Sequence, residues 1–292
     1  MSLIDGFEHV ARENESLAGY TRLKLGGPAE YFAEPTTKQE LTALVTRFSE
    51  EQKPIRLIGS GSNIIVGQEG VEGLVLHLAA PVFCELSVGQ NTITSGGGTK
   101  LVHFVSTAVR EGFAGPEQLV GIPGTVGGAL HCNSGAHGED IGTWVESAEV
   151  LTRSGEVLTR SGDSLSFSYR QSSLDELVIL RATFLFEKES PEMLTKQMQK
   201  LWIVRRSTQP FSQENAAYVF KDHGGESAGE LIDQCGLKGL QIGQVQVSEL
   251  DANIFLANPG ATSQQVLELI ERVKERVYES LSVELETAVR IW

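Results

Sequence analysis

The feature that most restricts the fold of this chain is a glycine-rich segment, Gly121-Ile-Pro-Gly-Thr-Val-Gly-Gly-Ala-Leu130, followed closely by Asn133-Ser-Gly-Ala-His-Gly138. Glycine reaches positive φ without Cβ strain and lets a ligand approach main-chain N–H groups, while Pro123 fixes one φ angle and removes one donor. Consecutive N–H groups that point inward form an anion-binding nest. A tightly packed turn is the alternative, but a pattern of this length favours a backbone that wraps a ligand.

The length and charge of the chain limit its organisation and partners. With 292 residues it exceeds the usual size of a single core, so two or three domains are expected. Lys and Arg total 24 against 38 Asp and Glu, for a net charge of −14. This balance argues against a nucleic-acid partner or an anionic membrane surface. An anionic ligand would need local basic residues.

The cysteines and the N-terminal residues bear on the cellular compartment. Cys84, Cys132 and Cys235 are odd in number, far apart and without zinc-ligand spacing, which predicts three reduced thiols and no metal site. The first twenty residues are acidic and lack the apolar stretch of a signal peptide. No later run approaches the roughly 18 apolar residues of a membrane span. We therefore expect a cytoplasmic protein without membrane insertion.

The N-terminal part reads as helix, strand and loop in that order. Residues 38–52 carry apolar side chains at helical spacing and lead into an apolar strand at 54–58. The loop Gly59-Ser-Gly-Ser-Asn63 follows, where α/β proteins commonly offer backbone amides to a phosphate. Taken by itself this loop is equally compatible with an ordinary turn.

From Val71 to Phe186 the pattern predicts a second, α+β lobe. Strand-like alternation occurs at 148–152, 156–159 and 177–186, interrupted by one helix near 100–112. Ser154-Gly155 predicts a hairpin turn between the first two of these strands. A polar stretch then leads into a helix that runs to about Arg206, so a domain boundary is placed near residue 190.

The C-terminal part predicts a long helix and a final strand. Thr262 and Gln265 fit a capping box. The apolar face of the helix is expected in the core and consists of Val266, Ile270, Val273, Val277 and Leu281. Val283 to Ile291 is predicted as a strand, with Glu284, Glu286 and Ala288 on one face and Leu285, Thr287 and Val289 on the other.

Several motifs in a fixed order carry a resemblance to a known family. They are Leu25–Tyr31, Gly59–Asn63, Gly121–Gly138, Phe167-Ser-Tyr-Arg170, Val219-Phe-Lys221, Ser227-Ala-Gly229, Gly236-Leu-Lys-Gly239 and Val247–Asn253. Together they resemble the UDP-N-acetylenolpyruvoylglucosamine reductases over nearly the whole chain. The chain lacks the longer insert that one subgroup carries before its substrate lobe, so it is similar to the shorter type.

The resemblance implies a fold, a reaction and a set of partners. The fold is α+β, with a two-lobed FAD-binding domain of the PCMH/vanillyl-alcohol-oxidase type at 1–73 and 74–189 and a C-terminal α+β substrate-binding domain at 190–292. The implied reaction uses NADPH and noncovalent FAD to reduce a UDP-sugar enolpyruvyl ether, UDP-N-acetylglucosamine enolpyruvate, to UDP-N-acetylmuramate for peptidoglycan synthesis. A monomer is expected, and neither His131 nor His137 is expected to link the flavin covalently.

The resemblance also implies roles for individual residues. The FAD pyrophosphate would be surrounded by Gly59, Ser60, Gly61, Ser62 and Asn63, with a second wall of Gly124, Thr125, Gly127 and Gly128. Ser60 replaces a glycine common in the family, which is tolerable unless φ must be positive there. Arg170 would hold the substrate carboxylate and polarise its double bond, a task that suits a planar guanidinium. Lys221 and Asn253 would bind the substrate.

The chain departs from the family at two catalytic positions. The family's proton-donor serine is replaced by Tyr218, and the glutamate of its C-terminal strand is replaced by Ala288. A phenol can donate a proton, but its oxygen lies several Å beyond that of a serine; Tyr218 therefore either acts as the acid or only fills space. Glu286 lies about 7 Å back along the strand, too far to substitute.

Two functions follow from these departures. The first is a working reductase that uses Arg170 and Tyr218 without the glutamate. The second is an altered paralogue that binds FAD or a UDP-sugar without this reaction. An intact flavin frame together with Arg170 favours the reductase, because the two together are more than a bare scaffold needs.

Overall fold

The computed structural model describes residues 2–210 and 215–292. The chain divides into two compact units, each assembled from three segments. The first unit consists of 1–15, 29–60 and 72–203, and the second of 16–28, 61–71 and 204–292. Among the described residues, no helix combines the length and the apolar character needed to cross a bilayer.

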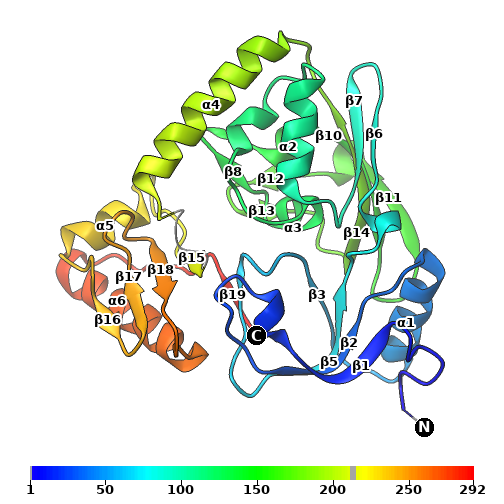
Figure 1. Cartoon of the computed structure of the whole chain (residues 1–292), viewed down its shortest axis with the longest axis horizontal. Coiled ribbons are helices and arrows are strands. Elements are labelled where there is room, and N and C mark those ends of the chain that lie inside the picture. The colour runs from blue at the N-terminus through cyan, green and yellow to red at the C-terminus, as the bar shows by residue number, and fades with distance from the viewer. Residues whose placement is uncertain (1, 211–214) are drawn as a thin grey trace. The chain divides into compact units, whose positions relative to one another are not determined.

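The first unit begins with a four-stranded sheet. Its strand order is β1 (Ala11–Ser16), β2 (Pro28–Ala33), β5 (Val71–His77), β3 (Ile55–Ile58), and β3 runs parallel to β5. Helix α1 (Lys38–Glu50) packs beside β3 (Figure 1). A capping box between Thr37 and Glu40 starts this helix, and the apolar face predicted from the sequence is buried. The predicted helix, strand and loop are therefore confirmed here.

A five-stranded antiparallel sheet forms the rest of the first unit. Its order is β11 (Val157–Ser161), β10 (Val145–Leu151), β14 (Val178–Leu185), β7 (Thr92–Gly96), β6 (Leu86–Val88). Helices α2 (Leu101–Arg110) and α3 (Val126–His131) lie against it (Figure 1). Their shared core includes Phe104, Phe184 and Phe186. Gly155, with φ of +83°, lies in the turn of the hairpin that was predicted between β10 and β11.

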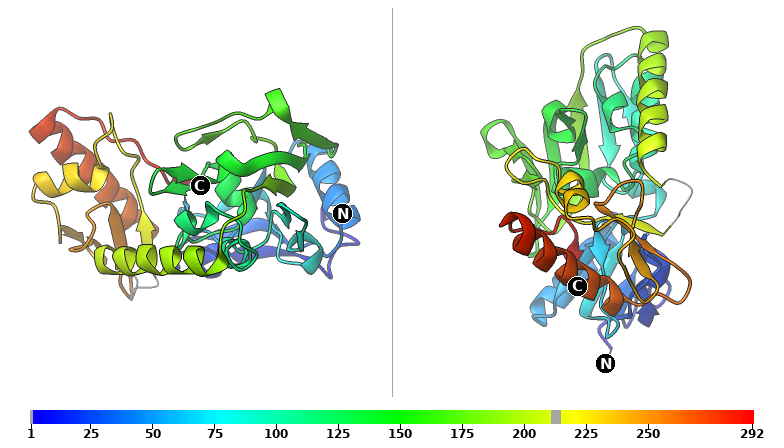
Figure 2. Two further views of the ribbon diagram at one scale, coloured as in Figure 1. Left: turned by 90° about the horizontal axis from the view of Figure 1, so that it is seen from above. Right: turned by 90° about the vertical axis from the view of Figure 1, so that its left-hand side faces the viewer.

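Shorter elements connect these sheets. The short strands of the first unit are β8 (Gly135–Ala136), β9 (Glu139–Asp140), β12 (Phe167–Ser168) and β13 (Gln171–Ser172). The 3-10 helices of the chain are η1 (Leu17–Tyr20), η2 (Pro81–Phe83), η3 (Pro116–Leu119), η4 (Ile141–Trp144) and η5 (Gly162–Ser164). Helix α4 (Pro191–Thr208) is uninterrupted in both views of Figure 2.

The second unit contains a four-stranded sheet and two helices. The sheet order is β15 (Ala216–Tyr218), β18 (Ile254–Ala257), β17 (Val245–Val247), β16 (Gln241–Ile242). Helix α6 (Ser263–Leu281) packs on β16, β17 and α5 (Ala228–Gln234). The core of the second unit also contains Leu23 and Ile65 from the N-terminal segments of this unit. β4 (Ile64–Ile65) pairs in parallel with β19 (Arg290–Ile291).

Two local expectations are corrected, and one helix was not anticipated. Residues 283–291 form a strand only at β19, because their other backbone groups bond to separate segments near Val219 and Lys221. Leu281 is 36% exposed, since it lies in the last turn of α6, whereas the other four residues of its face are buried. The glycine-rich segment contains helix α3, which its glycines disfavour by propensity.

The two units differ from the three contiguous ranges expected from the sequence. The segments 16–28 and 61–71 belong with the C-terminal residues, and residues 72–203 join the first sheet. The difference arises because β4 pairs with β19 and because Leu23 lies in the C-terminal core. Each unit is therefore discontinuous in sequence.

Candidate active site

The first part of the site is the loop that leaves β3. Gly59 follows Ile58 directly, and a Cβ built on Gly59 would lie 2.7 Å from Thr125 Oγ1. The glycine therefore allows the loop after β3 to approach the N-terminus of α3 within the first unit. The next residue, Ser60, is exposed and does not have a positive φ, so serine fits where a glycine was expected.

The glycines of α3 serve close packing inside the first unit. Gly127 donates its N–H to Gly97 O at 2.8 Å, and a Cβ at Gly127 would lie 3.0 Å from that oxygen. Val126 N donates to Thr99 O, and Gly128 N donates to the N-cap side chain Thr125. These three amides are paired within the protein, so an anion nest is not built from them.

One buried polar atom near this helix lacks a protein partner. Thr99 is 3% exposed, and its Oγ1 has no hydrogen-bond partner among the described residues. The carbonyl oxygen of Thr99 accepts from Val126 N in α3, and Gly97, two residues earlier, accepts from Gly127 N in the same helix. An unpaired buried hydroxyl is uncommon in proteins and calls for an explanation. A polar ligand that reaches Thr99 Oγ1 would supply the missing hydrogen-bond partner.

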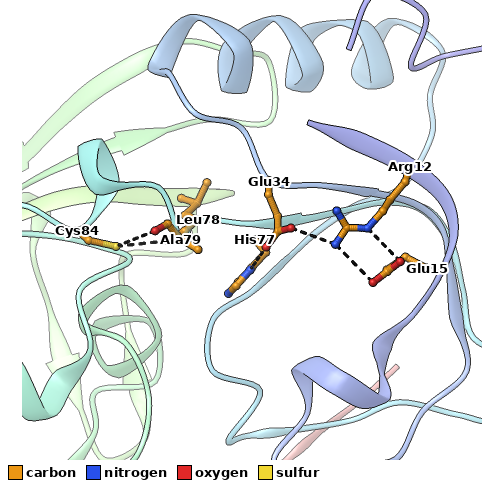
Figure 3. Close-up of polar contacts among 7 residues, drawn as sticks. All are labelled: Arg12, Glu15, Glu34, His77, Leu78, Ala79 and Cys84. Carbon is orange, nitrogen blue, oxygen red and sulfur yellow. Dashed lines mark hydrogen bonds and ion pairs between the residues drawn. The ribbon is translucent and has the colours of Figure 1, made fainter. Parts of the chain in front are cut away.

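A charged network supports the strand end from which the loop leaves. Ile58 pairs with His77, the last residue of β5. His77 Nδ1 lies 2.9 Å from Glu34, whose other oxygen accepts from Arg12 at 3.0 Å (Figure 3). Burial alone would raise the pKa of Glu34, but the hydrogen bonds from His77 and Arg12 outweigh it and lower that pKa. The network keeps Glu34 ionised and ties β1, β2 and β5 together.

The second half of the loop belongs to the other unit. Gly61 has φ of +58° and accepts from Arg22 N at 3.0 Å, and a Cβ there would clash with Tyr20 O. Asn63 donates its side-chain amide to Ala288 O at 3.0 Å. Gly61 and Asn63 therefore also organise the second unit, while Ser62 beside them is half-buried.

Arg170 lies in a tight turn of the first unit. The strands β12 and β13 pair through Ser168 and Gln171, which leaves Tyr169 and Arg170 as the two turn residues. Arg170 has φ of +56°, a left-handed value that is unusual for a residue with a side chain. Its guanidinium lies 5.8 Å from the Tyr169 ring. Backbone strain of this kind concentrates at functional positions.

Tyr218 ends β15 and contacts an acidic residue. Its hydroxyl donates to Asp222 Oδ1 at 3.3 Å, and the same oxygen accepts from Ala228 N at 3.0 Å. Asp251 lies nearby: burial raises the pKa of Asp251, and the negative charge of Asp222 adds to the rise. The phenol is therefore held beside a carboxylate, that of Asp222, which the sequence analysis did not single out.

Lys221 and the C-terminal segment lie side by side. Lys221 Nζ is 3.0 Å from Glu286 Oε2, and Lys221 N donates to Glu286 O at 2.8 Å. Ala288 donates its N–H to Val219 O at 2.7 Å. Glu286 is 75% exposed and turned to Lys221. Lys221, Tyr218 and the two positions 286 and 288 thus come together in the second unit.

Asn253 has a different environment from the one expected. It is 1% exposed, its Oδ1 accepts from Phe220 N at 2.8 Å, and its Nδ2 donates to Phe220 O at 2.8 Å. The side-chain amide thus pairs with both backbone groups of Phe220, the residue before Lys221, as a neighbouring strand would. Its geometry supports a role in positioning Lys221 and not a contact with substrate.

Sequence comparisons divide the chain between two known domains. Residues 29–161 match the FAD binding domain, and residues 209–292 match the C-terminal domain of UDP-N-acetylenolpyruvoylglucosamine reductase. The first match covers Gly59, Thr125 and the loops around them. The second covers Tyr218, Lys221 and Asn253. The expected FAD-binding fold with a separate C-terminal domain is thus confirmed.

Full-length relatives agree with these matches. Proteins named UDP-N-acetylenolpyruvoylglucosamine reductase from Rhodopirellula baltica and Bacillus subtilis are 40% and 34% identical, over 97% and 95% of this chain and 93% and 92% of theirs. The crystal structure of that reductase from Thermus caldophilus aligns with a TM-score of 0.82 at 33% identity, covering 97% of this chain and 99% of its own. The chain belongs to the UDP-N-acetylenolpyruvoylglucosamine reductase family.

Proposed function

We propose that this protein reduces UDP-N-acetylglucosamine enolpyruvate to UDP-N-acetylmuramate with FAD and NADPH, a step in peptidoglycan precursor synthesis. Membership of the family over nearly the full length supports the reaction class. The observation that carries the proposal is the full-length alignment with the crystal structure of that reductase from Thermus caldophilus, at a TM-score of 0.82 and 33% identity. Bound FAD would supply the hydride chemistry.

The residues that would hold FAD belong to the loop after β3 and to the start of α3. The proposed set is Gly59, Ser60, Gly61, Ser62, Asn63, Gly124, Thr125, Gly127 and Gly128. The Cβ-free contact of Gly59 with Thr125 and the unpaired Thr99 hydroxyl support this location. Since the amides of Gly127 and Gly128 are paired internally, their part is to let α3 pack closely.

Arg170 and Lys221 would bind the negative groups of the substrate. A guanidinium forms paired hydrogen bonds with a carboxylate and stabilises the negative charge that develops on it during reduction of the double bond. Lys221 suits a phosphate, and its ion pair with the exposed Glu286 can exchange for such a ligand at small cost. Asn253 would fix the backbone from which Lys221 extends.

Tyr218 would protonate the carbon next to the one that receives hydride. The phenol is a stronger acid than the serine hydroxyl it replaces, and its bond to Asp222 holds the ring in one orientation. Ala288 cannot take part in proton transfer, so the acid step would depend on Tyr218. Glu286 is engaged by Lys221 and does not replace the missing carboxylate.

The function is tested by following the flavin anaerobically. The flavin of the purified protein is reduced with NADPH, UDP-N-acetylglucosamine enolpyruvate is added, and the visible absorbance of the flavin is recorded. Rapid reoxidation with formation of UDP-N-acetylmuramate is the expected result. Persistent reduction in the presence of bound substrate would rule out the reductase and leave the altered paralogue.

A further inference from the structure

The hairpin that carries Arg170 is too short to fix its own position. β12 and β13 contain two residues each and pair through Phe167 with Ser172 and Ser168 with Gln171, and one further backbone bond runs from Ser173 N to Ser166 O at 2.9 Å. Isolated hairpins are marginally stable even when they are longer. The turn must therefore be held by contacts with other parts of the first unit.

Asn133 makes such a contact with both ends of its side chain. It is 2% exposed and has φ of +42°. Its Nδ2 donates to Ser168 O at 2.9 Å, and its Oδ1 accepts from Gly142 N at 3.0 Å. Ser168 immediately precedes the turn residues Tyr169 and Arg170. The buried amide is thus hydrogen-bonded to the backbone two residues before Arg170.

The same residue connects the hairpin to helix α3. Asn133 follows α3 by two residues, and its own N–H donates to Leu130 O at 3.2 Å. A second contact from α3 is made by His131, whose Nδ1 lies 3.1 Å from Leu174 O beyond β13. Phe167 packs over Gly142, where a Cβ would lie 2.4 Å from the ring. The hairpin is fastened to the helix that begins at Thr125.

Resting on the proposed function, we propose that Asn133 is a positioning residue that sets the place of Arg170 relative to the cofactor wall at the start of α3. It touches neither the cofactor nor the substrate and acts through the Ser168 carbonyl. A displacement of about 1 Å in a reacting group can slow a reaction about 100-fold. Asn133 is therefore expected to matter for the step in which substrate is reduced and not for reduction of the flavin.

The test uses Asn133→Asp with Asn14→Asp as its matched control. Aspartate keeps the acceptor for Gly142 N but places a carboxylate against Ser168 O. Asn14 is exposed on β1 and also has a positive φ, of +55°. Asn14→Asp therefore shows the effect of the same asparagine-to-aspartate change at a site away from the hairpin. Hydrogen exchange of peptides covering residues 166–174 and the two half-reactions are measured for each protein.

The expected result separates positioning from general damage. In Asn133→Asp, exchange of the hairpin peptides is about tenfold faster. Reoxidation of the flavin by substrate is about 10- to 100-fold slower, while flavin content and reduction by NADPH stay at the parent level. In the Arg170→Ala background, Asn133→Asp causes no further loss, because both changes remove the same contribution. Asn14→Asp behaves as the parent.

Other outcomes overturn the inference. Unchanged exchange at the hairpin, an equal slowing of both half-reactions, or additive losses with Arg170→Ala would each do so. If Asn133→Asp does not fold, Asn133→Gly is used, since glycine accepts the left-handed backbone and lacks both side-chain bonds; failure of both to fold would make Asn133 purely structural. If the parent itself does not reoxidise with substrate, the proposed function fails, and hydrogen exchange still decides whether Asn133 holds the turn.

Discussion

The backbone N–H of Ala288 donates to the carbonyl oxygen of Val219 at 2.7 Å, so Ala288 lies beside the residue that follows Tyr218. Tyr218 immediately precedes Val219. The proposed acid, Tyr218, and the position at which we propose that a catalytic carboxylate is missing, Ala288, therefore lie in one small region of the second unit. This relationship makes Tyr218 the first position to test.

Tyr218→Phe removes the phenolic hydroxyl and leaves the ring. We expect reoxidation of the flavin by substrate to slow about 100-fold, as is typical when a general acid is lost, with reduction by NADPH unchanged. Stopped-flow absorbance measures both steps. Tyr278→Phe, on the exposed face of α6, is the control. A Tyr218→Phe protein as fast as the parent would show that the tyrosine only fills space.

Asp222→Asn keeps a hydrogen-bond acceptor for Tyr218 and removes the negative charge 3.3 Å from its oxygen. A neighbouring carboxylate opposes formation of a phenolate, so its removal makes proton donation easier. We expect a substrate-dependent step about tenfold faster near neutral pH, with its alkaline decline moved to lower pH. The pH–rate profile checks this expectation. A pH–rate profile identical to that of the parent would show that Asp222 does not influence proton donation by Tyr218.

Gly59→Ala introduces a Cβ 2.7 Å from Thr125 Oγ1. The methyl group pushes the loop away from the start of α3. We therefore expect FAD to bind about tenfold more weakly, equivalent to about 1.4 kcal/mol of binding free energy. Titration of the flavin-free protein with FAD gives the affinity. Gly19→Ala should leave it unchanged, because a Cβ at Gly19 meets nothing within 4 Å.

Glu40 makes the stability of α1 depend on pH. A hydrogen bond from His9 and then backbone bonds from Thr36 and Thr37 lower the pKa of Glu40 from 4.5 to about 2. Because the folded pKa is below the unfolded one, this contribution is complete above pH 4.5 and disappears as the pH falls toward about 2.

Glu40→Gln is expected to lower the free energy of unfolding by about 1 kcal/mol at neutral pH, through a weaker capping box at the start of α1. Urea unfolding at several pH values should show this difference shrinking between pH 4.5 and about 2. Glu50→Gln, at the exposed end of the same helix, gives the comparison. A deficit that stayed constant with pH would mean that the charge of Glu40 is not responsible.

The sequence was a good guide where structure depends on neighbours along the chain. The apolar faces of both helices and the capping box at Thr262 identified α1 and α6 because i, i+3 and i, i+4 spacing is a local property. The final strand was overpredicted for the opposite reason. Alternation put Leu285 and Val289 on one face, and both are buried, but a strand also requires a continuous partner, which residues 283–289 lack.

The candidate site was less accessible to sequence reasoning. Asn253 and Asn133 each bond to a backbone that is more than 30 residues away, so motif position indicated that they belong to the site but not what they do there. Asp222 follows the Val-Phe-Lys motif by one residue, and its contact with Tyr218 depends on the turn that leads to α5. Such side-chain roles follow from tertiary structure alone.

The pairing of β4 with β19 has a consequence for how this protein can be divided. The core of the second unit takes Leu23 and Ile65 from segments that precede most of the first unit in the chain. A fragment starting at residue 204 would lack these side chains and the parallel partner of its last strand. The second unit is thus not a transferable module, and exchanging it between relatives by recombination would require three separate stretches of sequence to move together.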